Sequence, residues 1–488
     1  MSDKKGYLVF DIGTGNARVA VVSVNGEVLV IERGDIQYET ESLYPDSRYF
    51  SPQRLWDQVV GLAKRALSKA SHIEIIGITS TSQRQGIVLL DDNGDPFLGL
   101  PNIDNRGREW ELSIPDRAQL FRITGRLPSA LFSGLKLYGL KQRQPDLFER
   151  VHQFTSISEW VLYQLNGTVV YEPSQATETL LYDVGNNEWS PYLCDVFDVP
   201  FSLLPQVKES GTVLGTIAEE TRRRIGIEQS IPVIVGGGDT QLAVKSTGAK
   251  AGDIVIVSGT TTPIVQISDH FETSAEQSYW TNTHSEKGQW LFETNPGITG
   301  LNYQKLKSIF YQNDSYETMD AEISEIKGDN ACVSALGSYV SSDKNALAKG
   351  GFIFETPISP NLKRAHFVCA ALKEIAFSVK WNYDFLTKQQ KDLKIWGCGG
   401  GFQSRFLIQF MANLLNQPIH VKEGFEHASI AGAAVICNEA LNLNQETATS
   451  LSFYEPEGNN IEFALFEEWK QTQHFFAELK NKAAVPSC

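Results

Sequence analysis

The chain has 488 residues, which is more than one hydrophobic core usually supports, so two or more domains are expected. With 42% hydrophobic and 21% charged residues it has the composition of an ordinary globular protein. The formal net charge of −15 argues against a nucleic-acid-binding or membrane-binding surface and favours small or neutral partners.

The amino-terminal sequence MSDKKGYLVFDIG has only four apolar residues in a row before Asp11. That run is too short for a signal peptide or a membrane span, so a cytoplasmic location is expected. The cysteines are scattered without a close pair, which favours reduced, buried side chains over disulfides or zinc ligands. They are Cys194, Cys332, Cys369, Cys398, Cys437 and Cys488.

The first predicted feature is a β-hairpin in YLVFDIGTGNARVAVV, with Gly13, Thr14 and Gly15 in its turn. Backbone N–H groups of such a turn, and the threonine hydroxyl, can donate to phosphate oxygens. Asp11 ends the first strand and could hold magnesium directly or through water, while Arg18 could reach a phosphate oxygen. A plain hairpin is the alternative.

Further along the first half, a helix is predicted to begin at Ser51-Pro52, and the strand IEIIGITS leads to a turn around Gln83. The stretch 171–192 is rich in turn formers and is interpreted as a surface excursion. The strand in VIVGGGDTQLA ends in three glycines and Asp239. An aspartate after glycines is more often a turn or helix cap. Here, however, Asp239 lies shortly before a second glycine-threonine turn, at Gly259 and Thr260, and it could accept the proton of an attacking hydroxyl.

The second half repeats the order of the first. The hairpin IVIVSGTTTPIVQI carries Gly259 and Thr260 in its turn, and a helix over 365–386 and the strand and turn LKIWGCGGGFQS follow. Glycines before the next helix could let a flat ligand such as adenosine lie against the backbone. The order indicates a duplicated α/β unit, with domains at 1–248 and 249–488 and a ligand cleft between strand-end turns.

Taken in order, these motifs resemble those of the FGGY family of carbohydrate kinases. Within the family, their residues most resemble those of the autoinducer-2 kinase and xylulokinase-like branch. The resemblance is carried by DIGTGNAR, GITSTSQRQGIVLLD, NIDNR, GGGDTQ, SGTTT and GCGGGFQSRFLIQF. It implies an α/β fold of two actin-like, ribonuclease-H-like domains with an interdomain active-site cleft. The domains would close over ATP, Mg²⁺ and a small polyhydroxylated substrate.

The same resemblance assigns roles to matching positions. Asp239 would be the general base and contact the substrate, and Asp11 would help hold magnesium. Substrate hydroxyls would be read by Gln83, Arg84, Gln85 and Asp104, although Arg84 and Asp104 could instead form a surface ion pair. The nucleotide would contact Gly13, Thr14, Gly15, Arg18, Gly259, Thr260, Gly400, Gly401 and Ser404.

The positions that differ from the family pattern are mainly ones that bear on which substrate is bound. Gly139 replaces the usual tryptophan, Leu131 replaces the tyrosine of glycerol kinases, and Arg84-Gln85 replaces the usual Met-His of xylulokinases. Glycerol and xylulose are therefore not favoured, and another ketose, a polyol or a related hydroxylated carbonyl compound is expected. The main alternative to a kinase is an actin-like ATP-binding switch or scaffold. A third possibility is a degenerate kinase that acts as a sugar-responsive binding module. The sequence leaves open whether the protein forms a homodimer.

Overall fold

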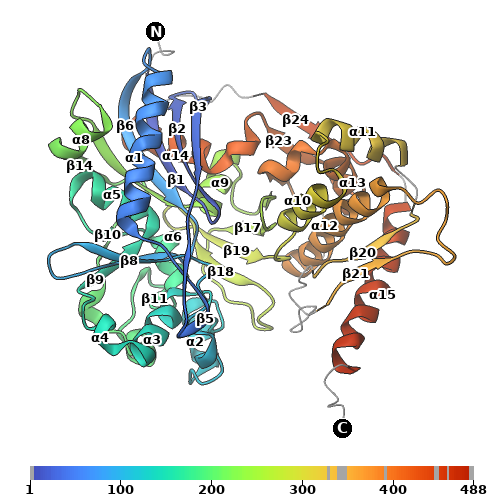
Figure 1. Cartoon of the computed structure of the whole chain (residues 1–488), viewed down its shortest axis with the longest axis horizontal. Helices are drawn as coiled ribbons and strands as arrows, with labels where there is room; N and C mark the ends of the chain where they lie inside the picture. Colours follow the sequence, from blue (N-terminus) through green and yellow to red (C-terminus); the bar gives the residue numbers. More distant parts are fainter. Residues whose placement is uncertain are drawn as a thin grey trace. The chain divides into compact units, whose positions relative to one another are not determined.

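The computed structural model describes residues 5–326, 330–337, 349–388, 393–443, 450–458 and 461–482. The chain divides into two compact units, each with its own sheet and helices (Figure 1). The first comprises Met1–Gly248, Ser268–Leu291 and His427–Thr449, and the second comprises Ala249–Ile267, Phe292–Glu426 and Ser450–Cys488. The second unit begins after Gly248, where the predicted ranges 1–248 and 249–488 also meet, and two later segments group with the first unit.

The first unit contains a six-stranded sheet in the order β14-β15-β6-β1-β2-β3. The central strands β1, β6 and β15 run parallel to one another, and β2, β3 and β14 are antiparallel to their neighbours. The strands are β1 (Lys5–Ile12), β2 (Asn16–Ser23), β3 (Val28–Asp35), β6 (Glu74–Ser82), β14 (Val213–Thr216) and β15 (Pro232–Gly238). The first predicted hairpin is confirmed as β1 and β2.

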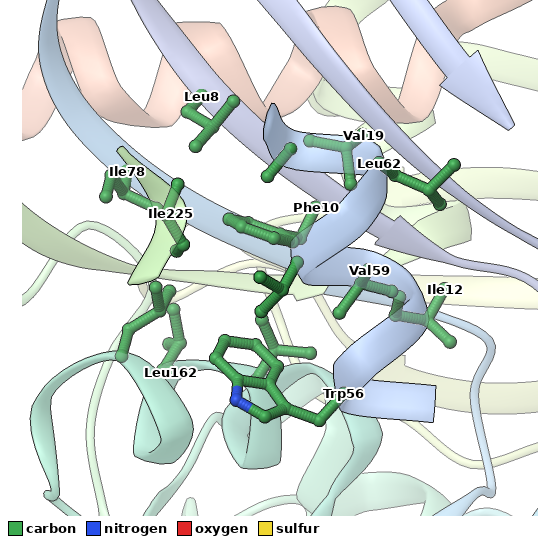
Figure 2. Close-up of a cluster of buried hydrophobic side chains, with 14 of the residues drawn as sticks. Leu8, Phe10, Ile12, Val19, Trp56, Val59, Leu62, Ile78, Leu162 and Ile225 are labelled. Carbon is green, nitrogen blue, oxygen red and sulfur yellow. The ribbon is translucent and has the colours of Figure 1, made fainter. Parts of the chain in front are cut away.

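Helices cover both faces of this sheet, and alternation along β1 divides its side chains between them. Leu8, Phe10 and Ile12 join a core formed with α1 (Pro52–Lys69) and α5 (Ile157–Asn166) (Figure 2). Tyr7 and Val9 point to the opposite face, where they pack with α9 (Asp239–Thr247) and α14 (Ala428–Ala440). Asp11 shares this second parity, so the end of β1 presents its carboxylate on the α9 and α14 face.

The predicted helix start at Ser51 is confirmed, since the Ser51 hydroxyl accepts a hydrogen bond from the Arg54 amide at 3.3 Å. A second core in this unit forms around the β8-β7-β9 sheet and α3. The remaining elements described for the first unit are β4 (Glu39–Glu41), β5 (Tyr44–Tyr49), β7 (Ile87–Leu90), β8 (Pro96–Leu100), α2 (Arg117–Thr124), α3 (Ser133–Arg143), α4 (Pro145–Phe148), β9 (Gln153–Ser156), β10 (Val170–Tyr171), α6 (Pro173–Ala176), β11 (Tyr182–Asp183), β12 (Glu188–Trp189), α7 (Pro191–Val196), β13 (Gln206–Val207), α8 (Glu219–Ile225) and β18 (Trp280–Thr283).

The interpretation of 171–192 as a surface excursion is wrong. Residues 171–182 are buried throughout, and exposure begins only at the turn around Asn186. The segment carries α6 and the 3₁₀ helix η3 (Thr177–Thr179), whose polar side chains hydrogen-bond within the protein. In this segment the turn-forming residues therefore lie in a buried, hydrogen-bonded polar layer.

In the second unit, β17-β16-β22-β23-β24 form a sheet whose order and strand directions repeat those of β2-β1-β6-β15-β14 in the first. The predicted duplication is thus present in the strand topology. The elements are β16 (Ile254–Val257), β17 (Ile264–Ser268), β19 (Trp290–Thr294), α10 (Gly300–Phe310), α11 (Tyr316–Ile326), β20 (Val333–Ala335), β21 (Gly351–Ile353), α12 (Arg364–Thr387), β22 (Ile395–Cys398), α13 (Arg405–Leu415), β23 (Ile419–Lys422), β24 (Leu451–Tyr454) and α15 (Ile461–Lys482).

Within the described residues, no helix combines the length and the apolar character that a membrane crossing requires. The five cysteines in the described ranges are free and buried, as expected, and Cys488 lies outside those ranges.

Candidate active site

Asp11 is buried, at 1% exposure, where β1 ends. Its Oδ2 accepts a hydrogen bond from Arg18 Nη2 at 2.5 Å, because Arg18 stands directly opposite in the hairpin. The same oxygen accepts a hydrogen bond from Ser429 Oγ at the start of α14, at 2.9 Å. Ser429 could not be identified from the sequence as a partner of Asp11, because it lies 418 residues away.

The first turn has the properties of an anion cradle. Gly15 is exposed, and a Cβ built on it would meet nothing within 4 Å, so packing within the protein does not require glycine there. Neither Gly13 nor Gly15 has a left-handed φ. Among the described residues, no acceptor is recorded for the amide N–H groups of Thr14 and Gly15. A glycine that the fold itself does not need, beside unused N–H donors, suits close approach of a ligand oxygen.

The second turn, in the second unit, is similar in its exposure. Gly259 and Thr260 are exposed, and the Gly259 amide donates to the Thr261 carbonyl at 2.8 Å. The Thr260 carbonyl accepts from the amides of Thr299 and Leu301, at 3.2 and 3.3 Å, which anchors the turn to the start of α10. The turn is therefore supported from within its own unit while its outer surface stays accessible.

The glycine cluster before α13 divides into two kinds of position. A Cβ on Gly400 would meet nothing within 4 Å, whereas a Cβ on Gly401 would lie 2.0 Å from Ser258 Oγ. Gly400 therefore offers open backbone, and Gly401 is required by packing. The Ser404 hydroxyl accepts a hydrogen bond from the Leu407 amide at 3.3 Å and so is the N-cap of α13.

Asp239 is the first residue of α9, directly after the glycines that end β15. Its Oδ1 accepts hydrogen bonds from the Thr240 amide at 2.7 Å and from Thr240 Oγ1 at 3.3 Å. Burial raises the pKa of Asp239 to about 6, the charge of Arg84 acts in the opposite direction, and the charge of Asp11 adds to the rise. A carboxylate with this pKa is ionised at neutral pH and is more basic than an ordinary aspartate.

A buried glutamate supports the end of β15, the strand that leads into Asp239. Glu172 Oε2 accepts hydrogen bonds from Ser174 Oγ at 2.5 Å and from the Gln175 amide at 3.1 Å. Ser174 Oγ in turn accepts from the Gly238 amide at 3.0 Å. Burial raises the pKa of Glu172 well above its ordinary value. The position of Asp239 thus depends on residues from the segment that the sequence pattern placed at the surface.

Arg84 and Gln85 are buried, at 8% and 6% exposure, and share one partner. Arg84 Nη1 donates to Glu178 Oε1 at 3.2 Å, and Gln85 Nε2 donates to Glu178 Oε2 at 2.5 Å. The surface location considered for an ion pair of Arg84 and Asp104 is therefore wrong, because both residues are buried; Arg84 pairs with Glu178, and Asp104 pairs with Arg106.

Asp104 is fully buried, and protein donors bind both of its carboxylate oxygens. Oδ1 accepts from the Arg48 amide at 2.9 Å, and Oδ2 accepts from Arg106 Nε at 2.8 Å. These contacts favour a role in fixing the loop over direct contact with a ligand. Residue 139 is glycine, where the resemblance leads one to expect tryptophan, because no larger side chain fits there. A Cβ at this position would lie 2.6 Å from the Arg106 carbonyl oxygen.

Gln83 joins the first turn to the segment NIDNR. Its Nε2 donates to the Gly13 carbonyl at 3.0 Å, and its Oε1 accepts from the Asn102 amide at 2.9 Å. Asn102 Nδ2 donates to Thr14 Oγ1 at 2.9 Å, and the Tyr38 hydroxyl donates to the Thr14 carbonyl at 2.6 Å. Both polar atoms of the Gln83 side-chain amide are thus hydrogen-bonded to backbone groups. These contacts connect the first turn to the loop that contains Asn102.

The side chains that the sequence reasoning missed are Glu178, Glu172, Tyr38, Asn102 and Ser429. For Glu172 and Glu178 the available signal was the run EPSQATETLL, in which polar residues other than lysine and arginine precede two leucines. Such a run fits a buried hydrogen-bonded layer as well as it fits a loop.

Two family models match this chain. The N-terminal domain of the FGGY family of carbohydrate kinases matches residues 6–245, and its C-terminal domain matches residues 254–441. Together these matches cover most of the chain, and they run in the same order as the two hairpins.

Curated relatives agree with the family match. A Bacillus subtilis (strain 168) protein with the provisional name sugar kinase YoaC is 62% identical over 490 residues, covering 99% of this chain and 100% of that protein. An autoinducer-2 kinase of Klebsiella pneumoniae is 27% identical over 312 residues, covering 62% of this chain and 58% of that protein.

Among solved structures, a ligand-bound xylulose kinase from Lactobacillus acidophilus has the same fold, with a TM-score of 0.82, 20% identity and 99% coverage of both chains. The N-terminal domain match contains the first Gly-Thr turn, and the C-terminal domain match contains the second turn and the glycine cluster before α13. The chain belongs to the FGGY family of carbohydrate kinases, whose members phosphorylate a sugar hydroxyl with ATP.

Proposed function

We propose that Asp239 is the general base of this kinase, and that its acceptor is a small ketose, polyol or related hydroxylated carbonyl compound. The observation that carries the proposal is the position of Asp239 at the start of α9, beside Arg84 and with a pKa raised to about 6. A carboxylate there is poised to accept a hydroxyl proton at neutral pH.

The proposed reaction is an in-line transfer. The acceptor oxygen forms a bond to the γ-phosphorus of ATP, the bond from that phosphorus to the bridging oxygen breaks, and ADP leaves. The acceptor's proton passes to the carboxylate of Asp239. Since the transition state of phosphoryl transfer is loose, the hydroxyl loses its proton late, and the position of Asp239 matters more than its strength as a base.

In the first unit, the amides of Thr14 and Gly15 in the first turn would bind phosphate oxygens. In the second unit, the turn at Gly259 and Thr260 would also bind phosphate. The two loops offer N–H and hydroxyl donors on exposed, glycine-containing backbone. Gly400 would provide open backbone for the nucleoside, with Gly401 and Ser404 shaping the loop around it.

Asp11 fits a magnesium site that is shared with phosphate. The described residues contain no group of three or more His, Cys, Asp or Glu side chains able to hold a metal ion. Mg²⁺ is typically bound by one or two carboxylates together with substrate phosphates and water, which a single buried aspartate beside a phosphate turn can satisfy. When bound, the ion would neutralise charge on the phosphate oxygens, and Arg18 and Ser429 would orient the Asp11 carboxylate.

Arg84 and Gln85 would bind acceptor hydroxyls, with Gln83 and Asp104 fixing the loops around them. Relatives named autoinducer-2 kinase and a structural neighbour named xylulose kinase make hydroxylated carbonyl compounds and ketoses the first acceptors to try. We place the reaction in the cytoplasm, where ATP is supplied, and we expect neither nucleic acid nor a membrane to be a partner.

The test is ATP-dependent phosphorylation across pentoses, ketoses, polyols, glycerol, gluconate and dihydroxypentanedione, detected by the mass gain of the acceptor. Asp239→Asn is assayed beside the parent, and Asp92→Asn, at an exposed position, is the matched control. We expect at least one acceptor to be phosphorylated by the parent and the control and not by Asp239→Asn. Near-normal turnover by Asp239→Asn would overturn the assignment of the base.

A further inference from the structure

Glu178 is the centre of a buried polar cluster that the reaction scheme above does not use. Its side chain is fully buried in η3, and its two carboxylate oxygens receive donors from three side chains. Oε1 accepts from Arg84 at 3.2 Å and from Arg126 Nη2 at 2.9 Å, and Oε2 accepts from Gln85 at 2.5 Å. One carboxylate therefore holds both residues that are proposed to contact the acceptor.

Contacts made by Arg126 hold the cluster in place. Arg126 is fully buried, and it donates to the Thr281 carbonyl at 2.9 Å and to the Asn282 side-chain oxygen. Its guanidinium lies 5.4 Å from the centre of the Phe132 ring and 5.8 Å from that of Trp280. Because these contacts set the position of Arg126, the Glu178 carboxylate has little freedom to follow a moving partner.

Gln85 has a strained backbone. Its φ of 65° lies in the left-handed region, which is uncommon for a residue other than glycine, asparagine or aspartate. The Gln85 carbonyl accepts a hydrogen bond from Ser133 Oγ at 3.0 Å, while its side chain is held by Glu178. A strained conformation persists where the surrounding structure holds it in place, and such positions cluster at ligand sites.

We propose that Glu178 is a positioning residue that, together with Ser133, holds Arg84 and Gln85 in the geometry that recognises the acceptor and so determines which acceptors are phosphorylated. The inference rests on the proposed function, in which Arg84 and Gln85 contact the acceptor. Fixed donors discriminate between hydroxyl patterns, because a wrong acceptor leaves a buried donor unpaired, whereas a mobile side chain can turn to another partner.

The experiment measures KM and kcat for both substrates in Glu178→Gln, a change that keeps the shape and removes the charge. We expect KM for the acceptor to rise roughly 10-fold or more, KM for ATP to stay within about 2-fold, and the preference for the best acceptor over the next best to narrow. Glu188→Gln, at an exposed glutamate of the same unit, is the matched control and should leave all of these values unchanged.

A second single variant guards against a folding defect in Glu178→Gln. Ser133→Ala removes only the hydrogen bond to the Gln85 carbonyl and alters no charge, so we expect a folded protein with a smaller rise in the acceptor KM and an unchanged KM for ATP. Combining Glu178→Gln with Arg84→Met should cost less than the product of the two single effects, because Glu178 acts in part through Arg84.

The outcomes separate the two proposals. A parent that phosphorylates no acceptor defeats the proposed function. An active parent whose Glu178→Gln variant is folded and keeps its acceptor KM and acceptor preference defeats the positioning role alone. If Glu178→Gln does not fold, Ser133→Ala decides, and an unchanged acceptor KM there overturns the inference.

Discussion

Arg18 lies directly opposite Asp11 in the β1–β2 hairpin, and its guanidinium donates to Asp11 Oδ2 at 2.5 Å. The Arg18 side chain is 27% exposed while that of Asp11 is 1% exposed, so the arginine is the solvent-facing partner of a buried carboxylate. In this arrangement the charge of Asp11 is balanced within the protein, and Arg18 remains accessible at the edge of the first Gly-Thr turn.

Replacing Arg18 by methionine should affect both stability and ATP binding. Among the described residues, the loss leaves Ser429 as the side-chain hydrogen-bond donor to Asp11. We therefore expect the free energy of unfolding to fall by roughly 1–3 kcal/mol, less than for a fully buried pair because Arg18 is partly exposed. ATP should bind more weakly, as measured by calorimetry. Arg33→Met is the control, since the Arg33–Asp35 pair is exposed and 4.0 Å apart and should contribute less than about 1 kcal/mol.

Activity should depend on pH through Asp239. Its pKa is raised to about 6, and a base must be unprotonated to accept a proton, so kcat/KM for the acceptor should fall as the pH drops through about 6. A pH–rate profile between pH 5 and 8 measures this. An acid limb near pH 4, where an ordinary aspartate titrates, would contradict the raised pKa.

The same raised pKa predicts that Asp239→Asn is more stable than the parent at neutral pH. The folded protein binds the Asp239 proton more tightly than the unfolded chain, so ionising Asp239 costs stability as the pH rises from about 4 to about 6. Removing that cost should raise the free energy of unfolding at pH 7 by roughly 2–3 kcal/mol. Denaturant unfolding at pH 7 and at pH 4 tests the sign, because the gain should be absent at pH 4.

Gln83→Leu should alter both substrate sites together. Gln83 joins Gly13 in the first turn to Asn102 in the following loop, so its loss should raise KM for ATP as well as for the acceptor, unlike the selective effect expected for Glu178→Gln. Steady-state kinetics with each substrate varied would distinguish the two patterns. Gln53→Leu, on the exposed face of α1, is the control and should change neither value.

Two glycine-to-alanine changes should have opposite consequences. Gly15→Ala places its methyl group in open space, so stability should change little while ATP affinity falls, because the methyl group obstructs the turn. Gly401→Ala places its methyl group 2.0 Å from Ser258 Oγ, so it should destabilise the protein by roughly 1–3 kcal/mol. Thermal unfolding with and without ATP measures both, and unchanged ATP affinity in Gly15→Ala would speak against the phosphate role of the first turn.

Features that depend on neighbouring residues could be predicted from the sequence. The hairpins at Asp11 and Gly259, the helix start at Ser51 and the helix over 365–386 follow from strand alternation, capping chemistry and helical periodicity, which are local properties. The duplication was visible for the same reason, since each half repeats the same local patterns in the same order.

The environment of each polar residue was decided by the tertiary structure. Arg84, Asp104 and Glu178 occur in sequence contexts that suit a surface as well as a core, and only contacts between distant segments bury them. Arg126, for example, meets Asn282 across 156 residues of chain, and Ser429 meets Asp11 across 418. The sequence by itself determined the family, the duplicated α/β plan and the two Gly-Thr hairpins. The partners that raise the pKa of Asp239 and hold Arg84 and Gln85 were decided by the fold, because desolvation and ion pairing act through space and leave no periodic pattern along the chain.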